Sequence, residues 1–461
     1  MITIRTNNKC SAEKQYILDV IFTEFLGINF HVRFENKLSG QTIYELPNGK
    51  KLINTDIFFE QAESQWLSKR TLPETPLKIL SIKDSSLPFK LPFSDISVIY
   101  GEPHITFSDP DTIYSKVDFW GSMFFMLSRY EEAISPDKDS HGRFPANASI
   151  AYKNNFLCRP IVNEYLELLW KVLQFLDQKL RRKERKFKNV LTCDVDWPYN
   201  PVNHNYKLFL KKTAKNIIKD KSIQKTWETA FEFIKVRMYG WKADSYNTFS
   251  YLMQLAEKEK MDLVFYFICD HSAAGIDGNY SINDKLISNL ISEINQRGHQ
   301  IGVHFSYNTY LDGKQINKEV GIFKDKLGLL GIKQDITGSR QHYLRYKTSE
   351  TIAHLNNAGL SYDSTLSFAE HAGFRSGVCY EYSMYDLSKR RKLCIKERPL
   401  IAMECSVISK KYMNLGYSEE ALKTFQLLKK QCALYQGNFI LLWHNSFLRP
   451  NDKALLEAIF N

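Results

Sequence analysis

Short apolar runs alternate with stretches of helical periodicity throughout the chain after residue 187. Seven runs have the length and composition of strands, and in most intervening stretches apolar residues recur every three or four positions. This alternation predicts a parallel sheet covered by helices, either open or closed into an incomplete barrel. The predicted strands are residues 190–196, 263–269, 301–306, 336–343, 362–367, 400–407 and 439–445, and the predicted helices are 247–260, 283–297, 317–330, 349–358 and 418–435.

The pattern before residue 188 is less regular and indicates a separate, smaller α/β domain. Helices are predicted at residues 14–25, 118–132 and 160–179, and strands at 30–34 and 96–100. We therefore predict an N-terminal α/β domain of unknown role over residues 1–187 and a second domain over 188–461. A charged helical insertion at 207–239 follows the first strand of the second domain. It is expected to form either part of a site's rim or a partner surface.

Polar side chains stand where the predicted strands of the second domain end. Asp194 and Asp196 are two apart, so they point to the same face of their strand. In parallel α/β architectures the carboxyl ends of the strands carry the active site. Two adjacent carboxylates raise one pKa and attract a cation. The alternative is that these acids cap the following loop.

Further polar residues end the other strands: His304, Arg340 with His342, Asp363 and His444. A metal site needs carboxylate and imidazole ligands from different strands, with one position open for water. An arginine beside a carboxylate lowers its pKa and fixes its orientation. A histidine at a strand end suits general acid catalysis near neutral pH. Taken alone, His304 is more typical of a buried, hydrogen-bonded histidine than of a metal ligand.

Together these motifs resemble the polysaccharide deacetylases of carbohydrate esterase family 4, the NodB-homology domain, over roughly residues 188–450. The resemblance implies a distorted (β/α)7 barrel with a divalent metal, zinc being the expected ion. It implies Asp194 as catalytic base and Asp196 as metal ligand in Thr192-Cys-Asp-Val-Asp-Trp-Pro198. His304 matches a ligand histidine, Arg340 matches the arginine that holds the base, and Leu442-Trp-His444 matches the motif of the general acid.

The sequence departs from this family at one metal ligand. The family motif has a second histidine four residues after the first, and here that position is Asn308. Asn308 could bind a harder metal through its amide oxygen. His342 stands where the family usually has proline and could supply the imidazole instead, or the metal could be lost. We favour His342 as the third ligand.

The resemblance implies a metal-dependent hydrolase that removes an N-acetyl group from an amino sugar in a glycan or in its lipid- or nucleotide-linked precursor. Two alternatives remain open. One is a related amidohydrolase acting on a non-sugar C–N bond, and the other is a degenerate barrel that binds carbohydrate or acts as a scaffold. The region before the barrel resembles the uncharacterised domain that precedes such barrels in some bacterial proteins.

Composition limits the compartment and the partners. The N-terminus has no apolar core typical of a signal peptide, and no run approaches roughly 18 apolar residues, so we expect a cytoplasmic protein. The eight cysteines are scattered without a Cys-x-x-Cys pair, which argues against a disulfide scaffold. The net charge of +11 is compatible with peripheral contact with an anionic membrane. No nucleic-acid-binding motif accompanies the basic stretches, so nucleic acid is not an expected partner.

Overall fold

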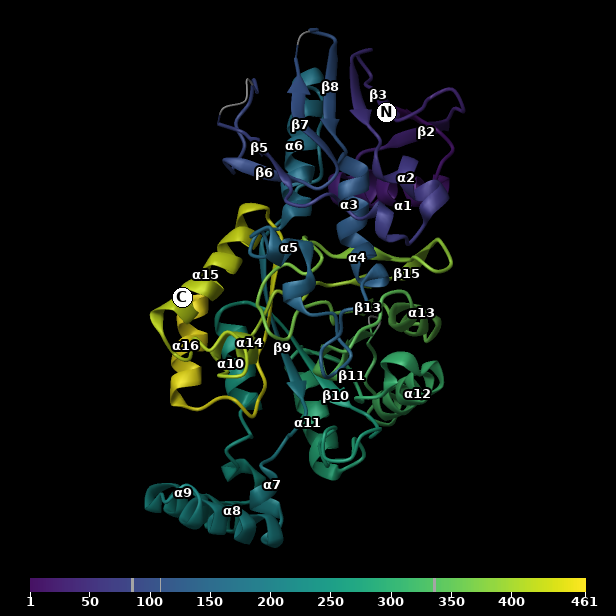
Figure 1. The fold of residues 1–461 in the computed structure, drawn as a ribbon. Coiled ribbons are helices and arrows are strands. Elements are labelled where there is room, and N and C mark those ends of the chain that lie inside the picture. The colour runs from purple at the N-terminus through teal and green to yellow at the C-terminus, as the bar shows by residue number, and fades with distance from the viewer. Residues whose placement is uncertain (84–86, 108, 335–336) are drawn as a thin grey trace. The chain divides into compact units, whose positions relative to one another are not determined.

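The structure, a computed structural model, describes residues 1–83, 87–107, 109–334 and 337–461 (Figure 1). The chain is divided into two compact units. The first unit contains Met1–Lys188, Leu344–Ala402 and Leu427–Phe439, and the second unit contains Asn189–Tyr343, Met403–Gln426 and Ile440–Asn461. The first segment thus ends beside the predicted boundary at 187/188. The organisation into two independent domains stays a prediction.

The first unit is built on a mixed six-stranded sheet. Its strand order is β2-β1-β3-β4-β8-β7, in which β1–β2 and β4–β8 are parallel pairs and the other pairs are antiparallel. Alternate residues of β1, β3 and β4 are buried, as expected for a sheet with one face on the core. The bounds are β1 (Ile2–Thr6), β2 (Phe30–Phe34), β3 (Gln41–Glu45), β4 (Lys51–Thr55), β7 (Gly101–Thr106) and β8 (Thr112–Val117).

The helices of the first unit differ from the prediction in two places. The predicted helix 14–25 is α1 (Ser11–Leu18), continued by a π-helical segment, Asp19–Leu26. The predicted helix 118–132 is broken into α3 (Phe119–Leu127) and α4 (Tyr130–Ile134), because Arg129 has a φ of 57°. The other elements of this unit are α2 (Phe58–Gln65), α5 (Ile150–Lys153), α6 (Ile161–Leu176), α13 (Glu350–Asn357), β5 (Lys78–Ser81), β6 (Asp95–Val98), β13 (Tyr362–Asp363), β14 (Tyr382–Asp386) and β15 (Arg391–Glu397).

A buried charge cluster lies at the break at Arg129. Glu132 accepts two hydrogen bonds of 2.8 Å from Arg375 and one of 3.0 Å from Nε of Arg129. All three side chains are at most 2% exposed. Burial opposes ionisation of Glu132, but the charges of Arg375 and Arg129 outweigh it and lower the pKa of Glu132 to about 2.

We expect this cluster to make the first unit sensitive to acid. The folded-state pKa of Glu132 lies below its unfolded value, so its stabilisation is complete above pH ~4.5 and is lost as the pH falls toward 2. The shift corresponds to about 3 kcal/mol. Glu132→Gln should lower the free energy of unfolding by about 3–5 kcal/mol at pH 7 and flatten its dependence on pH below 4.5. Urea denaturation across this range tests it, with Glu102→Gln of the exposed Lys78–Glu102 pair as control. Equal pH profiles for both variants would contradict the expectation.

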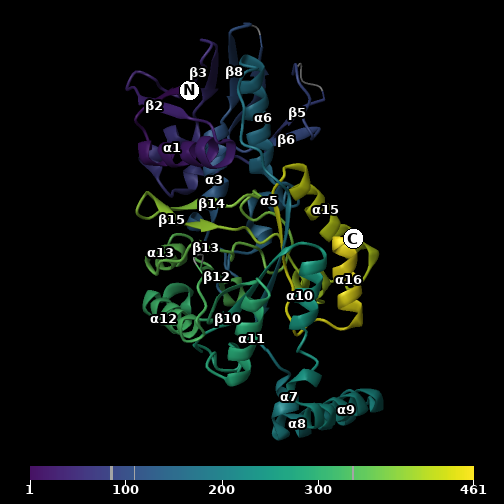
Figure 2. The same ribbon diagram turned by 180° about the vertical axis from the view of Figure 1, so that it is seen from behind.

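The second unit contains the parallel strands predicted from the alternating pattern. The pairs β9–β10, β10–β11 and β11–β12 are all parallel, and β17 (Asn438–Leu442) lies next to β9. Helix α10 packs against β10, and helix α11 packs against β11 (Figure 2). The remaining bounds are β9 (Lys188–Val195), β10 (Asp262–Ile268), β11 (Gln300–Phe305), β12 (Gly338–Gln341), α10 (Phe249–Lys258), α11 (Lys285–Gln296), α12 (Gly313–Leu329), α15 (Glu419–Leu434) and α16 (Pro450–Phe460).

The α/β class is confirmed, whereas closure into a seven-stranded barrel stays a prediction. Several predicted strands are shorter than expected. The strand predicted at 336–343 is β12 and ends at Gln341; its first residue, Ile336, lies outside the described residues. The strand predicted at 362–367 is only Tyr362–Asp363. The prediction of a strand at 400–407 was largely wrong. Strand β16 covers only Ala402–Met403, and helix α14 (Glu404–Ile408) begins at the next residue.

The predicted insertion forms a helical hairpin, which we call the arm: α8 (Tyr206–Ile218) and α9 (Ile223–Tyr239), preceded by the short α7 (Pro201–His204) (Figure 1). Phe209 and Phe233 stack between the two helices with their ring centroids 4.1 Å apart. The buried Asp244 carboxylate holds the base of the arm by accepting hydrogen bonds from the backbone of Asn200 and the side chain of Asn203. Within the part of the chain that the structure describes, no helix combines the length and the apolar character needed to cross a bilayer.

Candidate metal centre and active site

Asp194 on β9 is held by an arginine on β12, with β10 and β11 between the two strands in the sheet. Arg340 lies on β12 and is fully buried. Its Nη1 donates hydrogen bonds to Oδ1 of Asp194 at 2.8 Å and to Oγ1 of Thr192 at 2.9 Å. The guanidinium also lies 4.7 Å from the ring centroid of Tyr266, which faces Asp194 across the β9–β10 pair. One carboxylate oxygen of Asp194 is thus fixed, and the other lies 3.7 Å from Nε2 of His304.

His304 is positioned by the register of two strands. It lies opposite Arg340 in the β11–β12 pair, and its Nδ1 is 2.9 Å from the carbonyl oxygen of Arg340. A carbonyl only accepts hydrogen bonds, so Nδ1 carries the proton and Nε2 presents a lone pair. That Nε2 lies 3.2 Å from Oδ1 of Asp196.

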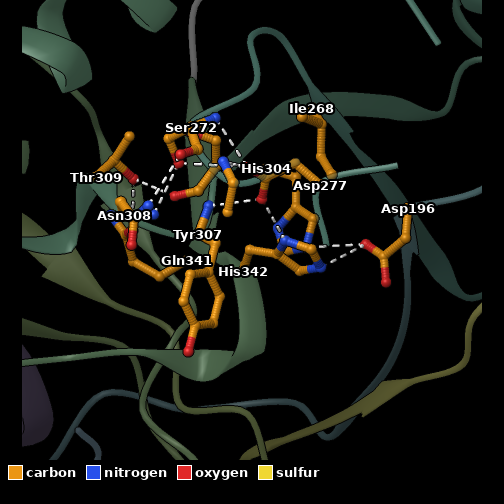
Figure 3. Close-up of polar contacts among 12 residues, drawn as sticks. Asp196, Ile268, Ser272, Asp277, His304, Tyr307, Asn308, Thr309, Gln341 and His342 are labelled. Carbon is orange, nitrogen blue, oxygen red and sulfur yellow. Dashed lines mark hydrogen bonds and ion pairs between the residues drawn. The ribbon is translucent and has the colours of Figure 1, made fainter. Parts of the chain in front are cut away.

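His342 is oriented in the same way by a carboxylate. Its Nδ1 donates to Oδ1 of Asp277 at 2.8 Å, which directs Nε2 toward Oδ1 of Asp196 at 3.6 Å (Figure 3). Asp277 also accepts hydrogen bonds from the backbone N–H groups of Ser272, Ala273 and Tyr307. A histidine whose second nitrogen donates to a carboxylate is the usual arrangement at protein metal sites.

The donor atoms of Asp196, His304 and His342 suit a divalent cation. They lie within 4.8 Å of one another. In the described part of the chain, Oδ1 of Asp196 is buried without a hydrogen-bond partner. Burial lowers the pKa of His342, but the carboxylates of Asp196 and Asp277 outweigh it and raise the pKa to about 9. The centre therefore favours positive charge. One carboxylate and two imidazoles, with room for a fourth ligand, is a set typical of catalytic zinc.

The structure places Asn308 away from this group. Its backbone N–H donates to Oγ of Ser272 at 2.8 Å, and its Nδ2 donates to the carbonyl oxygen of Ser272 at 2.9 Å. Figure 3 shows Asn308 beside Ser272, with His342 between it and Asp196. Of the two third ligands considered from sequence, His342 is the one that lies next to Asp196 and His304.

His444 follows β17 and has a partner that was not predicted. Its Nδ1 lies 2.5 Å from Oε1 of Glu404, the first residue of α14. The same oxygen accepts a hydrogen bond from the backbone N–H of His444, and Nε2 lies 3.7 Å from Oδ2 of Asp196. Burial disfavours the imidazolium, but the Glu404 carboxylate outweighs it and raises the pKa of His444 well above its usual value. Glu404, Cys405 and His444 form a second group of possible ligand atoms.

The loop after β10 supplies Asp277 and Gly278, which sequence reasoning also missed. Gly278 has a φ of +74°, and a Cβ there would lie 2.2 Å from the carbonyl oxygen of Asp196. The only signal in the sequence was an Asp-Gly pair in the loop that follows a strand. Asp363, which also ends a predicted strand, belongs to the first unit.

We expect Gly278→Ala to displace Asp196 and to weaken metal binding. The added methyl would collide with the backbone carbonyl of Asp196, which has no flexible end to move aside. Gly275→Ala is a matched control: Gly275 has a φ of +75° in the same loop, but nothing lies within 4 Å of its Cβ position. Zinc titration of both variants distinguishes the two effects of the added methyl: both positions have a positive φ and suffer backbone strain, but only Gly278→Ala crowds Asp196. A similar loss of affinity in both would contradict a positioning role for Gly278.

The chain was compared with protein families, with curated proteins and with solved structures. A family profile described as a family of unknown function (DUF7033) matches residues 2–178. No curated protein matches the chain in sequence. Among solved structures, one assigned as a polysaccharide deacetylase from Mycobacterium smegmatis is 15% identical, with a TM-score of 0.36 over 60% of this chain and 83% of that one. PuuE allantoinase is 11% identical, with a TM-score of 0.33 over 59% of this chain and 82% of that one.

Proposed function

We propose that the second unit is a metal-dependent hydrolase that removes an N-acyl group from an amino sugar, in a glycan or in its lipid- or nucleotide-linked precursor. One observation carries the proposal. A carboxylate held by a buried arginine and a histidine held by a buried glutamate both approach the same Asp196–His304–His342 centre, each at 3.7 Å. Base, acid and metal ligands in one place are the parts that metal-assisted hydrolysis requires.

Asp196, His304 and His342 would hold the cation, and zinc fits this donor set. When bound, the metal supplies Lewis acidity that polarises the acyl carbonyl and acidifies water. Asp194 has one oxygen fixed by Arg340, so its other oxygen is the one placed to take a proton from the attacking water. Asp277 would orient a ligand and not bind the cation itself, because it accepts a hydrogen bond from Nδ1 of His342.

His444 is placed to complete the reaction. The water oxygen bonds to the acyl carbon, Asp194 accepts the water's proton, and the C–N bond breaks as His444 donates a proton to the departing nitrogen. Glu404 keeps the imidazole protonated at neutral pH, so a proton is available for the amine. The products are a carboxylic acid, acetate for an N-acetyl substrate, and a free amino sugar.

Two aromatic side chains support a sugar as the substrate. Tyr343 is 38% exposed, and its ring lies 4.9 Å from that of His342. Tyr307 packs edge-on against it, with centroids 5.3 Å apart. An exposed tyrosine beside the metal centre offers an apolar face on which a sugar ring can stack.

The proposal is tested with the zinc-loaded protein by measuring acetate release from the N-acetylated sugars and ring opening of the cyclic amide by mass spectrometry. The substrates are N-acetylglucosamine oligomers, nucleotide-linked N-acetylglucosamine and a cyclic non-sugar amide. We expect acetate from one of the sugar substrates and no release after chelation. Cleavage of the cyclic amide alone would replace the proposal with a non-sugar amidohydrolase. Saturable sugar binding without turnover would replace it with a carbohydrate-binding protein.

A further inference from the structure

Helix α9 of the arm carries a continuous apolar stripe on its solvent side. The stripe residues are spaced by four, four, three and four positions, which places them within an arc of about 80° on the helix. Their exposed fractions range from 55% to 78%. They are Ile223, Trp227, Phe231, Ile234 and Met238. Large apolar side chains normally face a core when they recur at this spacing, so a stripe directed outward marks a surface that something covers.

Helix α8 presents a second stripe on the same side of the hairpin. Tyr206, Leu210 and Ile217 are 60%, 49% and 57% exposed. The face toward α9 is marked instead by Phe209, which stacks on Phe233. In each helix the stripe is rotated from the contact face by about a quarter to a third of a turn in the same sense. Because the helices are antiparallel, the two stripes open onto one side.

The opposite side of the hairpin is polar. Lys212, Glu228 and Glu232 line a cavity of about 540 Å³ whose other wall includes Leu448 and Arg449, from the segment before α16. The arm thus turns its polar face toward the rest of the second unit and its apolar face away from it.

The arm is also strongly basic. Residues 206–239 contain eight lysines and one arginine against three acids, a net charge of +6 within a chain whose total is +11. Among the described residues, Lys225 is the only one of these basic side chains that forms an ion pair, with Asp220 at 3.7 Å. By helical position, Lys207 lies about 60° and Lys211 about 100° beyond the edge of the α8 stripe, and Lys235 lies about 40° beyond the edge of the α9 stripe. These cations are available for anionic groups beside the apolar face.

We propose that the arm lies on an anionic lipid bilayer, with its apolar stripes among the acyl chains and its lysines at the headgroups. A long apolar face that contains Trp and Phe and is bordered by lysines is the pattern of helices that bind in the plane of a membrane interface. A neutral apolar partner would explain the stripes but not the charge. The arm begins at Tyr206, after the end of β9, Asp196 and the short α7, so a docked arm brings the carboxyl ends of the strands to the membrane side. Vesicle binding is measured without any enzymatic assay, so its result tests the membrane proposal independently of the proposed hydrolase function.

The test is co-sedimentation of the full chain with vesicles of phosphatidylcholine containing 30% phosphatidylglycerol, compared with phosphatidylcholine alone. We expect tighter binding to the anionic vesicles, weakened by salt. The double variant Trp227→Ser/Phe231→Ser should lose binding by at least about 10-fold, since it removes the two aromatic anchors. Replacing Lys207, Lys211 and Lys235 by Gln should reduce the preference for anionic vesicles. Leu329→Ser is the control, because Leu329 is 81% exposed on α12, outside the arm.

Other outcomes would overturn the proposal. Wild-type protein that stays in solution with both kinds of vesicle excludes a lipid surface. If the wild type is instead a dimer that Trp227→Ser/Phe231→Ser converts to a monomer, the face belongs to a second copy of the chain. Circular dichroism of each variant establishes that the helices still form, so that loss of binding is not loss of the arm.

Discussion

Replacing His342 by alanine is expected to lower the affinity for zinc by at least about 100-fold. Loss of a residue that merely orients a ligand typically costs 10–100-fold, and loss of a ligand should cost more. His342 directs Nε2 at Oδ1 of Asp196, and in the proposed ligand set it supplies the imidazole that the resemblance leads us to expect at position 308, where the sequence has Asn. Elemental analysis of the purified protein after dialysis against zinc, followed by titration against a competing chelator, measures the effect.

Two variants make this result specific to His342. Asn308→Ala should bind zinc as the wild type does, because the Asn308 amide is occupied by Ser272. Asp277→Asn should show an intermediate loss of about 10–100-fold, because it removes the carboxylate that orients His342. Metal retained by His342→Ala but lost by Asn308→Ala would reverse the assignment of the third ligand.

The parts of this site that could be predicted from sequence are those set by strand periodicity. Asp194 and Asp196 share a face because side chains alternate along a strand, and His304 and Arg340 meet because parallel strands end at one edge. Asn308 could be recognised as unusual because the family motif has a histidine at that position. His342 lies near Asp196 although β12 ends one residue before it, so its position depends on the turn that follows the strand.

The partners of these residues could not be predicted, because they come from segments distant in the chain. Glu404 lies 40 residues before His444, in a run that reads as a strand, and folds into the first turn of a helix with its carboxylate directed inward. Short apolar runs do not distinguish a strand from a buried helix. The same holds for the cluster at the break, in which Arg129 donates to Glu132 and Glu132 also pairs with Arg375, 243 residues away.

Replacing Asp194 by asparagine is expected to lower kcat/KM by about 10²–10⁴-fold, the range for loss of a general base, while zinc stays bound. Asparagine has nearly the same shape as aspartate and can still accept the hydrogen bond from Arg340, but it cannot take a proton at neutral pH. The three proposed ligands are unchanged. The measurement is the rate of acetate release together with the metal content of the same preparation.

Lost turnover with retained metal would distinguish a catalytic base at Asp194 from a metal ligand at that position and from a barrel without catalytic activity. Asp196→Asn should lose both, because Asp196 is the carboxylate of the proposed ligand set. Asp270→Asn, an acid that follows β10 and pairs with Lys318 on the surface, should lose neither. A barrel that binds carbohydrate without turnover predicts no effect of Asp194→Asn on any activity, since such a protein uses no catalytic base. Activity unchanged in Asp194→Asn but abolished in His444→Ala would instead move the base to His444, whose imidazole is held by Glu404 at the same distance from the centre.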